Sequence, residues 1–299
     1  MNPRVFLDRE QLHVGQLVMV TGQDGHHLSR VLRVQEGETI AIGASEKGYL
    51  AIVQSIDGKA GTVECRIEQE LPSHESVVRV YLIQGLPKAD KAESIVQHGT
   101  EVGLAGYLLY ESGRSVVHLD RKKAGQRLER WSKVVREAAG QSQRDLVPDV
   151  SYAARWVELK SWVEQLAPGL VLLLDEDEEV RSLKETLTAY AASKQGPISA
   201  RGAVARQDGL LGTTGLEGTT EMPRGAGDAG VANAGPADGL RPVVLCVGPE
   251  GGWDDKERQA FREQIGGVPV TLGPRILRTE TAGLVAASAV LYHFHAMGG

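Results

Sequence analysis

Short apolar runs separated by turn residues make up the first part of this chain. Over the first 70 residues the runs alternate with glycine or aspartate, as at Gly22, Gly37 and Gly48. Short runs with frequent turn residues are typical of a small β-barrel. The expected strands are residues 17–20, 39–42, 50–53 and 62–67. A Leu-Pro-Ser sequence at residues 71–73 then indicates a boundary, so a first domain is expected over residues 1–72.

A second pattern begins at residue 77, where apolar strands alternate with segments of helical periodicity. Some of these strands are unbroken apolar runs, as expected of strands that are covered on both faces. The expected strands are residues 77–82, 107–110, 170–174, 243–247 and 268–272. The expected helices are residues 88–103, 128–139, 178–192, 255–265 and 282–296. Asp254 is the expected N-cap of the fourth helix and Gly266 its stop. The fold class is therefore α/β over residues 73–299, preceded by the small barrel.

Composition limits the classes of protein that fit these elements. The 299 residues suffice for two domains, and a hydrophobic content of 41% is normal for a sizeable core. A net charge of −6 argues against a protein that coats nucleic acid, so any RNA contact must be local. Cys65 and Cys246 lie in apolar, strand-like sequence without metal-ligand spacing and are expected to be reduced core residues. Neither a signal peptide nor a run of roughly 20 apolar residues is present, so a cytoplasmic protein without membrane partners is expected.

Between about residues 193 and 241 the composition changes. This stretch is dominated by glycine and alanine, with threonine, proline and aspartate, and it has almost no aromatic or β-branched periodicity. Such a composition cannot bury enough apolar surface to offset the entropy of ordering. We expect a flexible insertion within the second domain, whose interior tolerates deletion.

Two glycine-containing loops follow directly on strands predicted near the carboxyl terminus. The first is Gly248-Pro249-Glu250-Gly251-Gly252, and the second runs from Gly273 to Thr281. Glycine lets the backbone approach a ligand closely, and ligands of open α/β sheets collect at the carboxyl ends of strands. The two loops therefore predict one pocket, whereas a lone glycine loop more often makes only a tight turn. The glycine and lysine spacings of a phosphate-binding loop and of a Rossmann loop are both missing.

The two loops together resemble a known family. Residues 247–252 read Val-Gly-Pro-Glu-Gly-Gly, and residues 272–282 read Leu-Gly-Pro-Arg-Ile-Leu-Arg-Thr-Glu-Thr-Ala. Both stretches closely resemble, without a gap, the SPOUT methyltransferases and specifically the RsmE-type family, which methylates N3 of a uridine in 16S ribosomal RNA. The resemblance implies a C-terminal trefoil knot, S-adenosylmethionine as cofactor, and a homodimer that completes each site.

The resemblance also implies roles for individual residues of the two loops. The residues expected at the cofactor, mainly through their backbone, are Val247, Gly248, Pro249, Glu250, Gly251, Gly252, Leu272, Gly273, Ile276, Leu277, Arg278, Thr281 and Ala282. Arg278 and Glu280 are the candidate catalytic residues. Arg278 would stabilise the developing uridine anion or its phosphate, and Glu280 would organise the loop or assist deprotonation. The alternative for Glu280 is a carboxylate favoured at a helix N-terminus by the helix dipole. No metal is expected, because the sulfonium of the cofactor already supplies a good leaving group.

RNA contacts are expected from the first domain and from the stretch before the knot. Arg-Val-Phe at residues 4–6 and His-Leu-Ser-Arg-Val-Leu-Arg at residues 27–33 resemble the PUA-like RNA-binding domain of the family. Residues 112–115 and 137–144 resemble two further family motifs and lie in a stretch with a local charge of about +6, although a solvated helix face is the usual meaning of such a charge run. The candidate RNA-binding residues are Arg4, Arg9, His27, Arg30, Arg33, Arg114, Gln141 and Arg144.

The chain departs from the family pattern at three positions. His98 stands where a lysine is usual, Gly113 replaces an acid, and Gly140 replaces a glutamate. These departures keep open a catalytically inactive assembly factor that binds ribosomal RNA. A SPOUT methyltransferase that acts on another RNA nucleotide is the second alternative. A nucleotide hydrolase comes last, because the lysine and magnesium ligands that it needs are missing.

Overall fold

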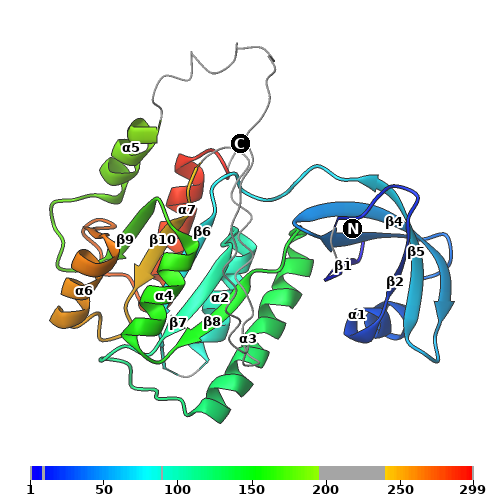
Figure 1. Ribbon diagram of the computed structural model, residues 1–299, viewed down its shortest axis with the longest axis horizontal. Helices are drawn as coiled ribbons and strands as arrows, with labels where there is room; N and C mark the ends of the chain where they lie inside the picture. The colour runs from blue at the N-terminus through cyan, green and yellow to red at the C-terminus, as the bar shows by residue number, and fades with distance from the viewer. Residues whose placement is uncertain (1, 9–10, 89, 195–239, 298–299) are drawn as a thin grey trace, which may run out of the picture.

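The computed structural model describes residues 2–8, 11–88, 90–194 and 240–297, which form two lobes (Figure 1). The N-terminal lobe contains one curled sheet with its own core, and the C-terminal lobe contains a parallel sheet with helices on both faces. Arg9 and nearly all of the expected insertion, residues 195–239, lie outside the described residues. None of the described helices is long and apolar enough to span a bilayer.

The N-terminal lobe is a five-stranded sheet in the order β1-β3-β4-β5-β2. Its strands are β1 (Arg4–Phe6), β2 (Leu17–Val20), β3 (Thr39–Ala44), β4 (Lys47–Asp57) and β5 (Thr62–Glu70). The four predicted strands are thus confirmed, while the three-residue β1, which pairs in parallel with β3, was not expected. A short helix α1 (Gly22–His26) and a π-helical turn η1 (His27–Leu32), also unexpected, connect β2 to β3.

The C-terminal lobe is organised by a six-stranded parallel sheet in the order β11-β9-β10-β6-β7-β8. Its strands are β6 (Val80–Gly85), β7 (Gly106–Tyr110), β8 (Asp149–Ala153), β9 (Leu170–Leu174), β10 (Val243–Val247) and β11 (Gly267–Val270). Every residue of β10 is buried, because Val243, Leu245 and Val247 face one core while Val244 and Cys246 face the other. The prediction of a strand covered on both faces is confirmed.

Helices cover both faces of this sheet. They are α2 (Lys91–Val102), α3 (Arg121–Gln141), α4 (Trp156–Leu166), α5 (Leu183–Lys194), α6 (Asp255–Ile265) and α7 (Thr279–His293). Residues of α2, α3, α5 and α7 belong to one core, and residues of α4 and α6 to the other. Asp254 caps α6 and Gly266 ends it at φ 68°, as predicted. Helix α4 was not expected, although its buried residues Leu159, Trp162, Val163 and Leu166 follow helical spacing.

The sheet order brings distant loops to one edge. Strands β6 and β10 are neighbours at the centre of the sheet. The next strand beside β6 is β7, and the next strand beside β10 is β9. In a parallel sheet all carboxyl ends lie at the same edge, and the position where connections diverge is the usual ligand site. The loops after β6, β7, β10 and β11 therefore meet at the carboxyl edge of β6 and β10.

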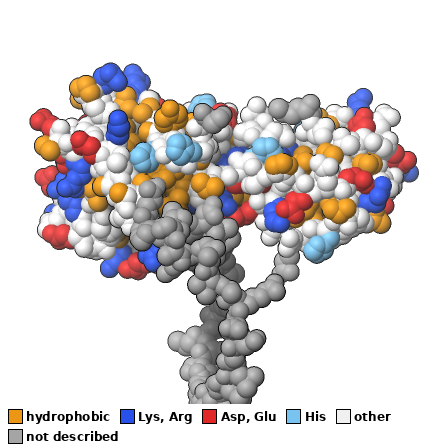
Figure 2. Space-filling view, turned by 90° about the horizontal axis from the view of Figure 1, so that it is seen from above, with side chains coloured by type: hydrophobic (Ala, Val, Ile, Leu, Met, Phe, Trp, Pro, Cys, Tyr) orange, Lys and Arg blue, Asp and Glu red, His pale blue; other side chains and the backbone are white. Residues whose placement is uncertain are grey.

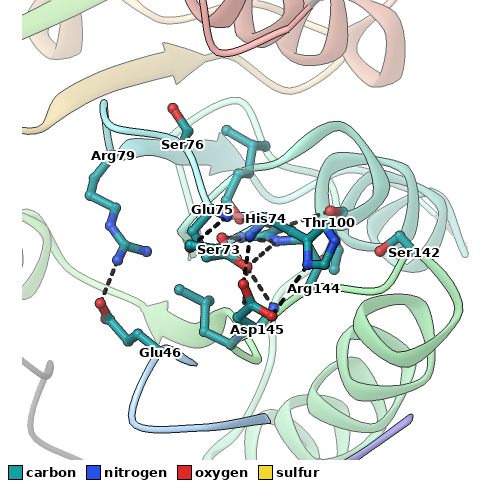
Figure 3. A network of polar contacts seen from close by, with 12 residues as sticks. Glu46, Ser73, His74, Glu75, Ser76, Arg79, Thr100, Ser142, Arg144 and Asp145 are labelled. Atoms are coloured by element: carbon teal, nitrogen blue, oxygen red, sulfur yellow. Dashed lines mark hydrogen bonds and ion pairs between the residues drawn. The ribbon is translucent and has the colours of Figure 1, made fainter. Parts of the chain in front are cut away.

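A network of polar contacts lies where the two lobes meet (Figure 3). Arg144, which directly follows α3, donates to both carboxylate oxygens of Glu75 and to the carbonyls of Thr100 and Leu104. The next residue, Asp145, pairs with the guanidinium of Arg4 from β1 and accepts from the backbone of His74 at 2.6 Å. The side chains of Arg4 and Asp145 are only 1% and 0% exposed.

This arrangement corrects the expectation for Arg4 and Arg144, because neither side chain reaches an RNA-accessible surface. Arg144 is 4% exposed, and each of its three guanidinium nitrogens already donates within the protein. Glycines on the N-terminal lobe make room for the joint. A Cβ at Gly48 would lie 2.5 Å from Oδ1 of Asp145, and one at Gly43 would lie 2.8 Å from its carbonyl oxygen.

Replacing Arg144 by methionine should lower the free energy of unfolding by about 3 kcal/mol, because it leaves the Glu75 carboxylate buried without a partner. Urea unfolding would measure this. The matched control is Arg155→Met, whose side chain is 72% exposed in its ion pair with Glu158 and whose loss should cost less than about 1 kcal/mol. Equal effects of the two substitutions would contradict the structural role of Arg144.

The same ion pair predicts a pH dependence. Burial would raise the pKa of Glu75, but the hydrogen bonds and charge of Arg144 outweigh it and hold that pKa below its ordinary value. A lowered pKa adds stability above the ordinary carboxyl pKa of about 4 and loses it as the pH falls. Unfolding followed from neutral to acid pH should therefore show a steeper loss of stability in the wild type than in Arg144→Met.

Candidate functional site

A buried glutamine ties the two predicted loops together. Gln84, at the end of β6, is fully buried, and its Nε2 lies 2.8 Å from the Thr279 hydroxyl and 3.2 Å from the carbonyl oxygen of Gly248. Thr279 in turn donates to the Gly248 carbonyl at 2.6 Å. One residue from each of three separate segments thus meets in a single contact, so the two loops lie side by side. The pocket expected between them stays a prediction.

Gln84 was not among the expected site residues, although it carries a recognisable signal. It is a polar amide at the end of an otherwise apolar, buried strand, where an unpaired polar group would be costly. Its Oε1 is buried and has no hydrogen-bond partner among the described residues. The carboxyl edge of β6 therefore offers an acceptor next to the first glycine loop.

Close backbone packing explains the glycines of the site. A Cβ at Gly85 would lie 2.4 Å from Cδ of Pro249, and a Cβ at Gly248 would lie 2.9 Å from the backbone of Gly252. Gly252 closes the loop by donating to the Pro249 carbonyl at 2.9 Å, and its φ of 67° is one that glycine adopts freely. The loop 248–252 therefore packs directly against the end of β6.

A lysine from α2 links the charged residues of both loops. Lys91 Nζ lies 3.1 Å from Oε1 of Glu250 and 3.1 Å from Oε2 of Glu280. Arg278, the N-cap residue of α7, is 82% exposed, with NH1 4.0 Å from Oε1 of Glu280. Both candidate catalytic residues therefore lie at the beginning of α7.

The environment of Glu280 decides between its two expected roles. Its own backbone N–H and then the charge of Lys91 hold its pKa below the ordinary value. For Glu250, burial would raise the pKa, but backbone N–H groups and Lys91 outweigh it and lower that pKa. A carboxylate with a lowered pKa is a weak base near neutral pH. The contact with Lys91 at the beginning of α7 is consistent with Glu280 as an organiser of the loop.

Arg114 also reaches the first loop, where it donates to the Gly251 carbonyl at 2.8 Å. The neighbouring Gly113 donates from its backbone to Glu257 at 2.9 Å. A Cβ at Gly113 would lie 2.7 Å from Oδ2 of Asp254, which caps α6. A side chain at position 113 would displace Oδ2 of Asp254, so glycine fits the local packing here.

The other predicted site residues differ in exposure. Gly273 and Ile276 are exposed, Ile276 by 83%, while Leu272, Leu277 and Ala282 are half-buried. Exposed RNA-binding candidates are His27, Arg30, Arg33, Arg114 and Gln141. Among them, Arg30 also donates to the carbonyls of Gly58 and Lys59 at 3.0 Å, so part of its guanidinium holds the turn between β4 and β5.

Two clefts lie away from these loops. One of about 420 Å³ is lined by Asp175, Asp177, Arg258 and Arg262 among others, beside α6. The other, of about 500 Å³, lies between the lobes and is lined by residues such as Glu46, Tyr81 and Asp149. Within the described part of the chain, no group of three or more His, Cys, Asp or Glu residues is arranged to hold a metal ion.

Comparisons with known proteins agree with this geometry. Residues 74–200 and 228–291 match the model of an RNA methyltransferase domain, and residues 20–68 match that of an RNA methyltransferase PUA domain. The chain is 34% identical to the ribosomal RNA small subunit methyltransferase E of Bacillus subtilis (strain 168), over 99% of this chain and 97% of that protein. It is 27% identical to the protein of the same name from Mycobacterium bovis, over 92% and 86% of the two chains.

A solved structure shows a similar fold. The crystal structure of a ribosomal RNA small subunit methyltransferase E from Neisseria gonorrhoeae, bound to S-adenosyl methionine, aligns with a TM-score of 0.67 and 26% identity. The alignment covers 98% of each chain.

The packing at Gly85 gives a prediction for the first loop. Gly85→Ala should lower the free energy of unfolding by about 1–3 kcal/mol, because the new methyl group would overlap Pro249 and push the loop outward. Urea unfolding and hydrogen exchange of residues 248–252 would measure both effects.

The matched control for that substitution is Gly125→Ala. Gly125 lies in α3 with no atom within 4 Å of an added Cβ, so alanine there should stabilise the helix by about 1 kcal/mol. A Gly85→Ala variant that is as stable as the wild type would show that the loop is not packed as described.

Proposed function

Because the chain belongs to the ribosomal RNA small subunit methyltransferase E family, we propose that it methylates N3 of a uridine in 16S ribosomal RNA, with S-adenosylmethionine as donor. The single observation that carries this proposal is the contact of Gln84, Gly248 and Thr279, which brings both family motifs to one place. The loops of residues 247–252 and 272–282 would then hold the cofactor.

The residues present fit such a cofactor. Glycines at 248, 251 and 252 leave the loop backbone free of side chains, and the buried Oε1 of Gln84 is an acceptor without a partner in the described part of the protein. When bound, S-adenosylmethionine supplies an activated methyl group on a sulfonium. The protein then has to position the uridine and to stabilise the charge that develops when N3 loses its proton.

Arg278 and Glu280 have different roles in our proposal. Arg278 is exposed at the N-cap of α7, where its guanidinium can pair with the uridine anion or a neighbouring phosphate. Glu280 stays ionised and holds the first turn of α7 against Lys91. In this proposal Glu280 orders the loop through its ion pair with Lys91.

The two lobes would serve different parts of the RNA. We assign residues 1–72 to a PUA-like domain that contacts RNA through His27, Arg30 and Arg33, which lie on its exposed surface. Residues 73–299 form the methyltransferase domain, and Arg114 and Gln141 are its exposed RNA candidates. The buried joint of Arg4, Glu75, Arg144 and Asp145 supports a fixed orientation between the domains.

The chain path also supports the trefoil knot in this proposal. Strand β11 lies at one edge of the sheet, yet α7 packs on α2, β6 and β10. Residues 271–278 must therefore run back across the carboxyl ends of β9 and β10. Such a return over earlier loops is rare among folds and is what a knotted arrangement requires.

A homodimer completes the proposal. Helix α7 is apolar on more than one side, since Ala286, Ala287, Val290 and Leu291 are buried while Val285 is 42% and Tyr292 68% exposed. Figure 2 shows hydrophobic side chains gathered on the C-terminal lobe, some beside histidines. Exposed apolar surface on an otherwise buried helix is typical of a subunit interface.

Light scattering should therefore give the mass of a dimer for the wild type and of a monomer for a Val285→Asp/Tyr292→Asp variant, because a buried unpaired charge disfavours the interface. Val157→Asp is the control, since Val157 is 60% exposed on α4. A wild-type monomer at micromolar concentration would exclude a shared site.

Methyl transfer is the direct test of the function. Labelled S-adenosylmethionine and small ribosomal subunits that lack the modification should yield labelled 3-methyluridine on nucleoside analysis. Arg278→Ala should lower kcat/KM by about 100-fold, as for the loss of a group that stabilises developing charge. Arg155→Ala, which removes an exposed arginine outside both loops, is the control and should retain most of the activity.

Other outcomes would identify the alternatives. Tight binding to the subunit without transfer would indicate an inactive assembly factor, and label in another nucleoside would indicate a different RNA target. Equal activity of Arg278→Ala and the wild type would remove Arg278 from the catalytic group.

A further inference from the structure

Lys91 forms ion pairs with two carboxylates that come from different loops. Glu250 comes from the loop after β10 and Glu280 from the first turn of α7, and each has an oxygen 3.1 Å from Lys91 Nζ. The backbone N–H of Lys88, just before α2, also donates to Glu250 at 3.2 Å. Glu250 therefore has two partners near the beginning of α2, this N–H and the ammonium group of Lys91. The two loops are therefore joined by charge as well as by the buried contact of Gln84.

Glu280 also faces a second cation. Its Oε1 lies 4.0 Å from NH1 of Arg278, at the outer limit of an ion pair, whereas its Oε2 is in close contact with Lys91. A carboxylate that is already neutralised by one cation attracts a second cation less strongly. The shorter distance shows that Lys91 is the closer partner of Glu280. The exposures agree, because the side chain of Arg278 is 82% exposed and that of Lys91 only 33%.

We propose that Lys91 is a positioning residue, which holds Glu280 so that the guanidinium of Arg278 stays free for RNA. The inference rests on the proposed function, in which Arg278 contacts the RNA. Without the ammonium group of Lys91, Glu250 and Glu280 would be two like charges beside each other. Glu280 would then turn to Arg278, the nearest remaining cation, and withdraw it from the RNA.

The protonation states are consistent with this arrangement. The pKa of Lys91 is raised by Glu280 and Glu250, and the pKa values of both carboxylates are lowered. All three groups are therefore charged at neutral pH. The role of Lys91 is electrostatic, so arginine should replace it and an apolar side chain of similar length should not.

The test compares four variants with the wild type. They are Lys91→Met, Lys91→Arg, Glu280→Gln and the double variant Lys91→Met/Glu280→Gln. Steady-state transfer gives kcat and KM for small subunits, and a direct binding assay with a uridine-containing 16S RNA fragment gives RNA affinity. Calorimetry with S-adenosylmethionine and urea unfolding show whether each variant keeps its cofactor site and its fold.

Lys91→Met should raise KM for the RNA about tenfold with a smaller effect on kcat, because binding rather than chemistry is impaired. Lys91→Arg should stay close to the wild type. The decisive result is the double variant, in which Glu280 can no longer capture Arg278, so that RNA affinity should return to within about threefold of the wild type.

Lys160→Met is the matched control, since Lys160 is 38% exposed and pairs with Glu164 on α4. The inference is overturned if Lys91→Met behaves like this control, or if the double variant is as impaired as Lys91→Met alone. Failure of the proposed function would look different. The wild type would then transfer no methyl group, and the RNA affinities of the five proteins would still decide the role of Lys91.

Discussion

The side chain of Gln84 is the contact on which the site depends. It is fully buried at the end of a central strand, and it joins the carbonyl of Gly248 to the hydroxyl of Thr279. A buried amide is costly unless it is paired, so the fold gains by bringing these partners to it. The loop after β10 and the beginning of α7 are held together as a result. The parallel sheet supplies the frame, because β6 and β10 end at the same edge.

A second constraint acts just after the C-terminal end of α3. Asp145, which follows this helix, makes the buried pair with Arg4 that connects the lobes. Its neighbour Arg144 makes a buried pair with Glu75 within the C-terminal lobe. Arg136 of α3 adds a hydrogen bond to the Phe6 carbonyl and an ion pair with Asp24. Buried pairs are weak evidence for stability, but they define geometry strongly, because every misalignment leaves a charge unpaired. The ion pair between Arg4 and Asp145 therefore fixes the N-terminal lobe at one orientation to the C-terminal lobe.

The charged groups of the site leave the guanidinium of Arg278 exposed. Lys91 satisfies Glu250 and Glu280, and Arg278 stays exposed beside them. An acidic protein can bind a polyanion through a local cation, provided that other cations neutralise the carboxylates beside it. The net charge of −6 is therefore compatible with an RNA substrate.

Much of the fold could be read from local sequence signals. The apolar run of β10 and the Asp254 cap of α6 depend on neighbours within a few residues, and both were predicted correctly. The glycines of the first lobe were less reliable as turn signals, because Gly22 begins α1 and Gly48 lies within β4. Strand β8 was missed because only its last residue is buried, so its sequence has no apolar run. The two loops could be placed at one site because each follows a strand of the same sheet. Their sequence also identified the family.

The partners of the arginines could not be derived in that way. Arg4 and Arg144 carry the same charge as surface arginines, and only the folded chain shows that they face Asp145 and Glu75, 141 and 69 residues away. The roles of Gln84 and Lys91 were hidden for the same reason. Periodicity, caps and turn residues act locally, so the sequence by itself determined the elements and the family. Burial and long-range charge pairing depend on how those elements pack, so only the tertiary structure decided which polar residues are buried in ion pairs and which remain exposed.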